Sequence, residues 1–117
     1  MPEEQSYALN LDLSQKVVVD TEKMGWEGSR ADNVLRKPLE RESQESGRAT
    51  SIVQFMPGAS FPAHRHDMGE EIFVLQGEFI DEHGRYPAGT WIRSPHKSLH
   101  DPWVEQETLI WVKTGHS

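Results

Sequence analysis

The stretch GASFPAHRHDMGEEIFVLQG, residues 58 to 77, sets two histidines one residue apart, follows them with two glutamates and continues into an apolar run. On a β-strand, residues two apart point to the same face, so we expect His64 and His66 to direct their imidazoles into one space. If the strand resumes at Glu70, then Glu70 and Glu71 point to opposite faces, and only one of them can share a side with the histidines. The stretch therefore predicts a metal site whose ligands stand on β-strands.

A further ligand has to come from elsewhere in the chain, because two histidines and one carboxylate would leave the site held by one short segment. The remaining histidines are His83, His96, His100 and His116. His83 lies in the turn-like sequence EHGR and His116 is next to the C-terminus, so we expect neither in a rigid interior site. His96 and His100 share a loop-like segment, 94–102, and their spacing alone does not choose between them.

The composition excludes several classes of function. The net charge of −7 leaves no basic surface to neutralise phosphates, so we expect no nucleic-acid partner, and an acidic surface also disfavours anionic membranes. The chain has no cysteine, so any metal must be held by nitrogen and oxygen. The first residues lack the features of a leader, and no run approaches the roughly 18 apolar residues of a spanning helix. We therefore expect a cytoplasmic protein.

The arrangement of apolar and turn residues predicts an all-β fold. Short β-rich segments are separated by turn signals, which is typical of a sandwich or barrel. The predicted strand segments are 7–20, 48–58, 71–80, 90–93 and 107–113. With 117 residues the chain is large enough for one domain, and we expect residues 1–6 to be a disordered N-terminus and 7–117 to form that domain.

Two segments between the predicted strands carry no clear alternation. Residues 26–37 are polar and irregular, and Pro38 excludes a helix at that point. Residues 40–47 carry mixed charges around serine and glycine, which indicates an exposed hairpin loop between two strands.

The residues described so far resemble the two sequence motifs of the cupin superfamily. The first motif has Gly, His-x-His, Glu and Gly at fixed intervals, and the matching residues here are Gly58, His64, His66, Glu70 and Gly77. The stretch GTWIRSPHKSLHDPWV, residues 89 to 104, is similar to the second motif through Gly89, Pro95 and His100. Lys97 stands where the family usually has Gly, and Val104 where it often has Asn.

The resemblance implies a fold and a ligand set. It implies a single cupin-type β-barrel, also called a double-stranded β-helix or jelly roll. It also implies that His64, His66, Glu70 and His100 bind one divalent metal ion, which leaves His96 in the loop. Three imidazoles and one carboxylate accept iron, manganese, nickel, cobalt or zinc, so the donor set leaves the metal open.

A closer resemblance extends over most of the chain, from about residue 17 to 114. The sequences LRKPLE (35–40), RATSIVQFMPGASFPAHRH (48–66) and DEHGRYPAGTWIRSP (81–95) together resemble the cupin domain of the ChrR-like anti-sigma factors and related stand-alone cupins. ChrR-type regulators add a helical sigma-binding domain with its own zinc ligands. This chain shows neither that domain nor cysteine, so we do not expect anti-sigma activity.

The resemblance implies two functions. A divalent ion held by one carboxylate leaves the site at about +1, which favours an anionic or enolate-like ligand in an open position. The first function is a metal-dependent dioxygenase or isomerase acting on a small oxygenated substrate, since similar folds and sequences occur among metal-dependent dioxygenases. The alternative is a non-catalytic module that senses a metal or small ligand. We also expect a homodimer to bury apolar strand faces outside the barrel.

Overall fold

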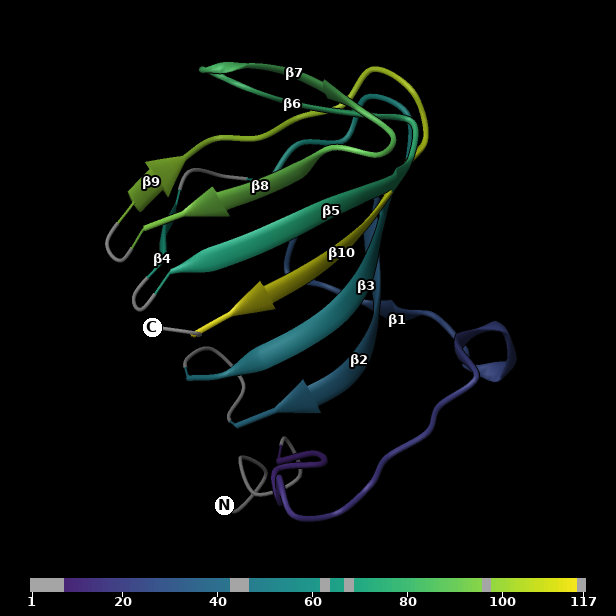
Figure 1. The fold of residues 1–117 in the computed structure, drawn as a ribbon. Coiled ribbons are helices and arrows are strands. Elements are labelled where there is room, and N and C mark those ends of the chain that lie inside the picture. The colour runs from purple at the N-terminus through teal and green to yellow at the C-terminus, as the bar shows by residue number, and fades with distance from the viewer. Residues whose placement is uncertain (1–7, 43–46, 62–63, 67–68, 96–97, 116–117) are drawn as a thin grey trace.

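The structure, a computed structural model, describes residues 8–42, 47–61, 64–66, 69–95 and 98–115, with the backbone alone for 64–66 and 98–100. These residues form β-strands, one short 3-10 helix (Thr21–Lys23) and no α-helix, so the prediction of an all-β fold is confirmed (Figure 1). The strands are β1 (Glu27–Gly28), β2 (Val34–Arg41), β3 (Ala49–Phe55), β4 (His64–His66), β5 (Glu70–Gln76), β6 (Glu78–Asp81), β7 (Gly84–Pro87), β8 (Trp91–Ser94), β9 (Ser98–His100) and β10 (Thr108–Thr114). In the described part of the chain, no helix has the length and apolar character needed to cross a membrane.

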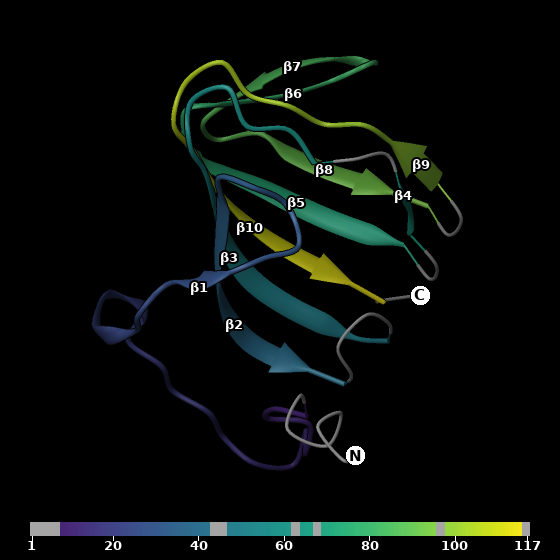
Figure 2. The same ribbon diagram turned by 180° about the vertical axis from the view of Figure 1, so that it is seen from behind.

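A curved six-stranded antiparallel sheet forms the larger wall of the fold. Its strand order is β1-β2-β3-β10-β5-β8, so the last strand of the chain inserts between β3 and β5. The pairs β4–β9 and β6–β7 form two smaller sheets. Figure 2 shows β4, β9 and the loop after β1 in front of the inner face of the large sheet. The sheet and these segments therefore enclose an interior between them.

Alternation along the strands selects which side chains enter this interior. On β5, Glu70, Ile72 and Val74 are buried, whereas Phe73 and Leu75 on the other parity are exposed. The predicted faces of this strand are therefore confirmed. The core also contains Phe55 and Phe79, whose rings meet edge to face with centroids 5.9 Å apart, a favoured aromatic arrangement.

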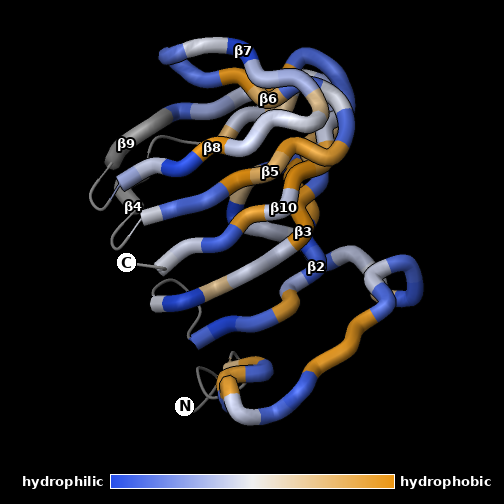
Figure 3. The backbone as a smooth tube through the Cα atoms, viewed as in Figure 1, coloured by the Kyte–Doolittle hydropathy of each residue, from blue (hydrophilic) through white to orange (hydrophobic). Residues whose placement is uncertain are grey.

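The interior has an apolar end and a polar end. Apolar residues concentrate where β5, β10 and β3 approach the β6–β7 hairpin, and polar residues collect at the opposite ends of these strands (Figure 3). The polar end is also where β4 and β9 pair (Figure 1).

Four of the predicted segments differ from the structure. Residues 8–20 form no strand beyond an isolated bridge between Leu9 and Arg41, because their valines find no neighbouring strand to pair with. The segments predicted as irregular (26–37) and as a hairpin loop (40–47) contain β2, which continues to Arg41. The predicted loop 94–102 contains the short strand β9. The predicted disordered N-terminus, residues 1–6, lies outside the described residues.

Candidate functional site

A cavity of about 180 Å³ lies between the inner face of the large sheet and the segments that cover it. Its sheet side is formed by alternate residues of β2, β3, β5 and β10, and Ser29, Phe61 and Pro102 close it from the other side. The lining residues from the sheet are Val34, Arg36, Arg41, Ala49, Ser51, Val53, Phe55, Glu70, Ile72, Ile110, Val112 and Thr114. Most of this lining is apolar, so the few charged groups in it determine what the cavity can bind.

Glu70 is the acidic group in this cavity lining, and it is 5% exposed. Its neighbour Glu71 lies on the other face of β5, half-buried, where it pairs in register with Lys113 and Arg93. The prediction that the two glutamates point to opposite faces is confirmed. Since buried carboxylates in proteins are paired with cations or coordinate metals, the position of Glu70 fits a metal ligand.

The backbone brings the predicted histidines together. β4 and β9 are antiparallel, with His64 directly opposite His100 and His66 opposite Ser98. Residues opposite each other in such a pair have Cα atoms about 4.5–5.5 Å apart. His64 and His100 are therefore neighbours, although 36 positions separate them in the sequence. The side chains of His64, His66 and His100 lie outside the described residues, as do His96 and His116.

The predicted ligand set is compatible with a divalent ion, and its geometry stays a prediction. Three imidazoles and one carboxylate match the donors that iron, manganese, nickel and zinc accept. Among the described side chains, which include Glu70 and exclude the three histidines, no group of three or more His, Cys, Asp or Glu could hold a metal ion. Of the other histidines, His83 is exposed in the turn between β6 and β7, in agreement with its exclusion as a ligand.

Two arginines in the cavity were missed from the sequence. Arg36 and Arg41 both line it from β2. On a regular strand, two residues that are five positions apart would point to opposite faces. The register shifts between Pro38 and Glu40, since Pro38 pairs with Ser51 and Glu40 with Thr50. Leu39 is the extra residue of this β-bulge, so the residues of β2 after it point to the opposite faces from those that regular alternation would give them. The alternation of apolar and polar residues along a single sequence does not reveal such a reversal.

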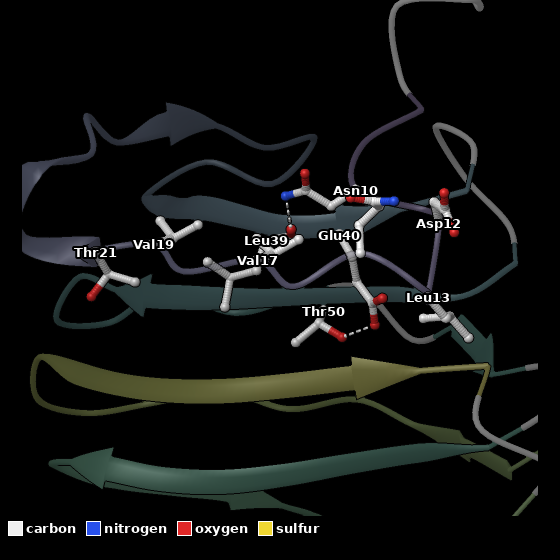
Figure 4. Close-up of a pocket in the computed structure, with 10 residues that line it drawn as sticks. Asn10, Asp12, Leu13, Val17, Val19, Thr21, Leu39, Glu40 and Thr50 are labelled. Carbon is white, nitrogen blue, oxygen red and sulfur yellow. Dashed lines mark hydrogen bonds between the residues drawn. The ribbon is translucent and has the colours of Figure 1, made fainter.

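A second cavity, of about 360 Å³, lies on the outer side of β2 and β3, where Glu40 and Thr50 line it (Figure 4). None of its lining residues is a predicted ligand. The segment before β1 covers it through residues such as Val17 and Val19. Thr50 donates a 2.6 Å hydrogen bond to Glu40 within it. Burial raises the pKa of Glu40, but hydrogen bonds from Thr50 and Arg48 and the positive charges nearby outweigh burial and lower the pKa overall. Although this cavity is larger, the one holding Glu70 is the better candidate site because it lies inside the fold and carries the buried charges.

Solved structures define the class of fold. A putative acetylacetone dioxygenase from Methylibium petroleiphilum PM1 is similar with a TM-score of 0.76 and 19% identity, over 86% of this chain and 77% of that one. An acetylacetone dioxygenase from Acinetobacter johnsonii has a TM-score of 0.70 and 18% identity, over 86% and 72%. The complex of Rhodobacter sphaeroides SigE with the anti-sigma ChrR matches with a TM-score of 0.67 and 24% identity, over 81% of this chain. At these identities the likeness shows the fold alone, and the fold is a single cupin-type β-barrel, as predicted.

The family follows from the sequence itself. The ChrR Cupin-like domain matches residues 14–117, and the chain belongs to this family. The chain spans about half of the matched chain in the SigE–ChrR complex, 50% of its length. No curated protein matches the sequence.

Proposed function

We propose that this cupin binds one divalent metal ion through His64, His66, Glu70 and His100 and acts as a metal-dependent dioxygenase or isomerase on a small oxygenated substrate. Two observations on β4, β9 and β5 support the proposal. His64 and His100 are register partners, and Glu70 is buried in the lining of an interior cavity. When bound, a divalent ion supplies a Lewis acid that polarises the oxygen atoms of a substrate.

The chain's own residues would bind and shield such a substrate. Phe55, Ile72 and Ile110 give the cavity an apolar floor that limits the access of water. Thr114 and Ser51 add hydroxyl groups on the same lining. A cavity of about 180 Å³ has room for about six water-sized groups, which indicates a small ligand. Two structurally similar proteins are acetylacetone dioxygenases, the first of them putative, which supports a β-diketone or a related enolisable compound as the substrate.

Dioxygen uptake by untagged protein tests the catalytic proposal. The protein would be loaded in turn with iron, manganese, nickel and zinc, and offered acetylacetone and a panel of related ketones. The proposal expects consumption of dioxygen or formation of an isomer with one of these metals, and loss of that activity in Glu70→Gln. Its matched control is Glu71→Gln, which changes the adjacent carboxylate on the opposite face and should keep the activity.

Membership of the ChrR family favours a second candidate, a sensing module without turnover. In this case the site would hold zinc in a closed coordination shell, and a partner protein would respond to the metal or ligand. Stoichiometric zinc, with no turnover under any of the metals and substrates above, would favour this candidate over the enzyme.

We also propose that the protein is a homodimer. Leu13 and Val18 are 76% and 80% exposed in the segment before β1, and Val17 and Val19 are exposed beside them. Consecutive exposed valines on one extended segment form the kind of apolar surface that a second copy of the same chain would cover.

A further inference from the structure

Arg41 carries a buried positive charge on the wall of the interior cavity. The residue is 7% exposed, and its Nε atom has no hydrogen-bond partner among the residues that the structure describes. An arginine stays protonated in proteins and has five N–H donors, so a buried guanidinium needs an acceptor. Leaving one of its donors unsatisfied in the interior is costly, and such a group calls for a ligand or an ordered solvent molecule.

The β-bulge at Leu39 is what brings Arg41 to the cavity. Without the extra residue, Arg41 would share the outer face with Lys37, whose ammonium group donates to the carbonyl of Thr21 and lies 4.5 Å from the ring centroid of Trp26. With the bulge, Arg41 lies opposite Ala49 and lines the same cavity as Arg36. Bulges commonly re-aim a side chain next to a functional site.

The position of Arg41 relative to Glu70 limits the shape of a ligand. Arg41 pairs with Ala49, Ala49 with Thr114, and Thr114 with Glu70, so one row across β2, β3, β10 and β5 joins the two charged residues. Three strand spacings of about 4.8 Å separate their backbones by roughly 14 Å, a distance that the two inward side chains shorten. A ligand that reaches from Arg41 to the site at Glu70 must be short, with an anionic group at the end that contacts Arg41.

We propose that Arg41 is the carboxylate-recognition subsite of this cavity, and that the ligand is a small diketo acid rather than a neutral diketone. The carboxylate would accept paired N–H donors from the guanidinium, a geometry for which arginine is well suited. The diketone end would extend toward Glu70. The choice of a diketone rests on the proposed metal site, whereas the carboxylate subsite rests on Arg41 and the cavity alone.

A matched pair of ligands tests the subsite. 2,4-Dioxopentanoate and acetylacetone (pentane-2,4-dione) share the same diketone, and only the first has a carboxylate. Isothermal titration calorimetry would compare the two with wild-type protein, Arg41→Gln and Arg93→Gln, each metal-loaded and metal-free, at one fixed pH and ionic strength. Arg93 is the control because it is an exposed arginine that stacks on Trp91 at 5.3 Å, away from the cavity lining.

The proposal expects the wild type to bind the diketo acid about 10- to 100-fold more tightly than acetylacetone, the range of a hydrogen bond to a charged group. Arg41→Gln should remove this preference and Arg93→Gln should keep it. Arg41→Gln should also melt close to the wild type, since it removes a buried Nε–H donor that has no acceptor among the described residues. If Arg41→Gln does not fold, Arg41→Lys provides the test. Lysine keeps the positive charge but lacks the paired N–H donors of the guanidinium, so this variant should show a smaller preference for the diketo acid.

The outcomes separate this proposal from the metal site. An Arg41-dependent preference that persists without metal supports the subsite even if no metal binds. Metal-dependent binding of both ligands with equal affinity overturns the subsite and leaves the metal site standing. An unchanged preference in Arg41→Gln, or in Arg41→Lys where only that variant folds, also overturns it.

Discussion

Glu70 and Arg41 line one interior cavity from opposite ends of a single row of the sheet, with Thr114 and Ala49 between them. Glu70 reaches this position by regular alternation of β5, and Arg41 reaches it through the bulge in β2. The same end of the interior receives β4 and β9, where His64 and His100 are register partners. Glu70, Arg41 and the paired His64 and His100 therefore lie toward one end of the barrel.

The two glycines that bound the first motif differ in what they do for the fold. Both have a positive φ of 82°, which costs a non-glycine residue about 1 kcal/mol. A Cβ at Gly58 would meet nothing within 4 Å, whereas a Cβ at Gly77 would lie 2.8 Å from Cα of Thr108 and still closer to the carbonyl oxygen of Glu107. We expect Gly58→Ala to lose about 1 kcal/mol of unfolding free energy and Gly77→Ala about 3 kcal/mol or more, measured by urea denaturation. Equal losses in the two variants would contradict this account of the motif.

The outer face of β2 should give a pH-dependent contribution to stability. Glu40 accepts hydrogen bonds from Thr50 and Arg48, and its pKa in the folded protein lies below the usual glutamate value of 4.5. A lowered folded-state pKa stabilises the protein above the unfolded-state pKa, and the contribution is lost as pH falls through the folded-state pKa. We expect Glu40→Gln to cost on the order of 1 kcal/mol at pH 7 and progressively less below pH 4.5.

Denaturation of the wild type and Glu40→Gln at pH 7, 5, 4 and 3 measures this difference. Glu27→Gln is the control, because Glu27 is exposed on β1. A cost that is the same at every pH would show that the charge of Glu40 does not contribute.

The exposed valines before β1 give a prediction about assembly. Val18→Asp places a charge on the most exposed of them, so it should separate the proposed dimer without unfolding the subunit. Sedimentation velocity should show a dimer for the wild type and for Lys16→Gln, a polar change in the same exposed segment, and a monomer for Val18→Asp. A wild type that sediments as a monomer at tens of micromolar would exclude this assembly.

The sequence was most informative where alternation and turn residues agree. The strand that became β5, the facing of Glu70 on it and the turn around residues 82–83 were all predicted, because each depends on local geometry. The strand β2 was missed because its alternation is hidden. Its inward residues include Arg36 and Pro38, and a proline is tolerated there because β1 pairs with only the first part of β2, leaving an edge at a bulge.

The opposite error occurred at residues 7–20. Three consecutive valines favour a strand, but β-propensity is realised only where a neighbouring strand and a buried face are present. Val17, Val18 and Val19 have neither in the described chain, and they are exposed. The inward position of Arg41 was not predicted for a related reason. Residues 40–47 were predicted to be a loop, and a one-residue bulge does not change the hydrophobic pattern of the sequence.

The metal content of the untagged protein tests the central claim most directly. Inductively coupled plasma mass spectrometry should find about one divalent ion per chain in the wild type. His100→Ala should lose most of that metal while circular dichroism shows a retained β fold, because it removes the register partner of His64. His96→Ala, a histidine of the same 94–102 segment, should keep the metal. Full metal content in His100→Ala, with loss in His96→Ala, would contradict the ligand set on which the account is built.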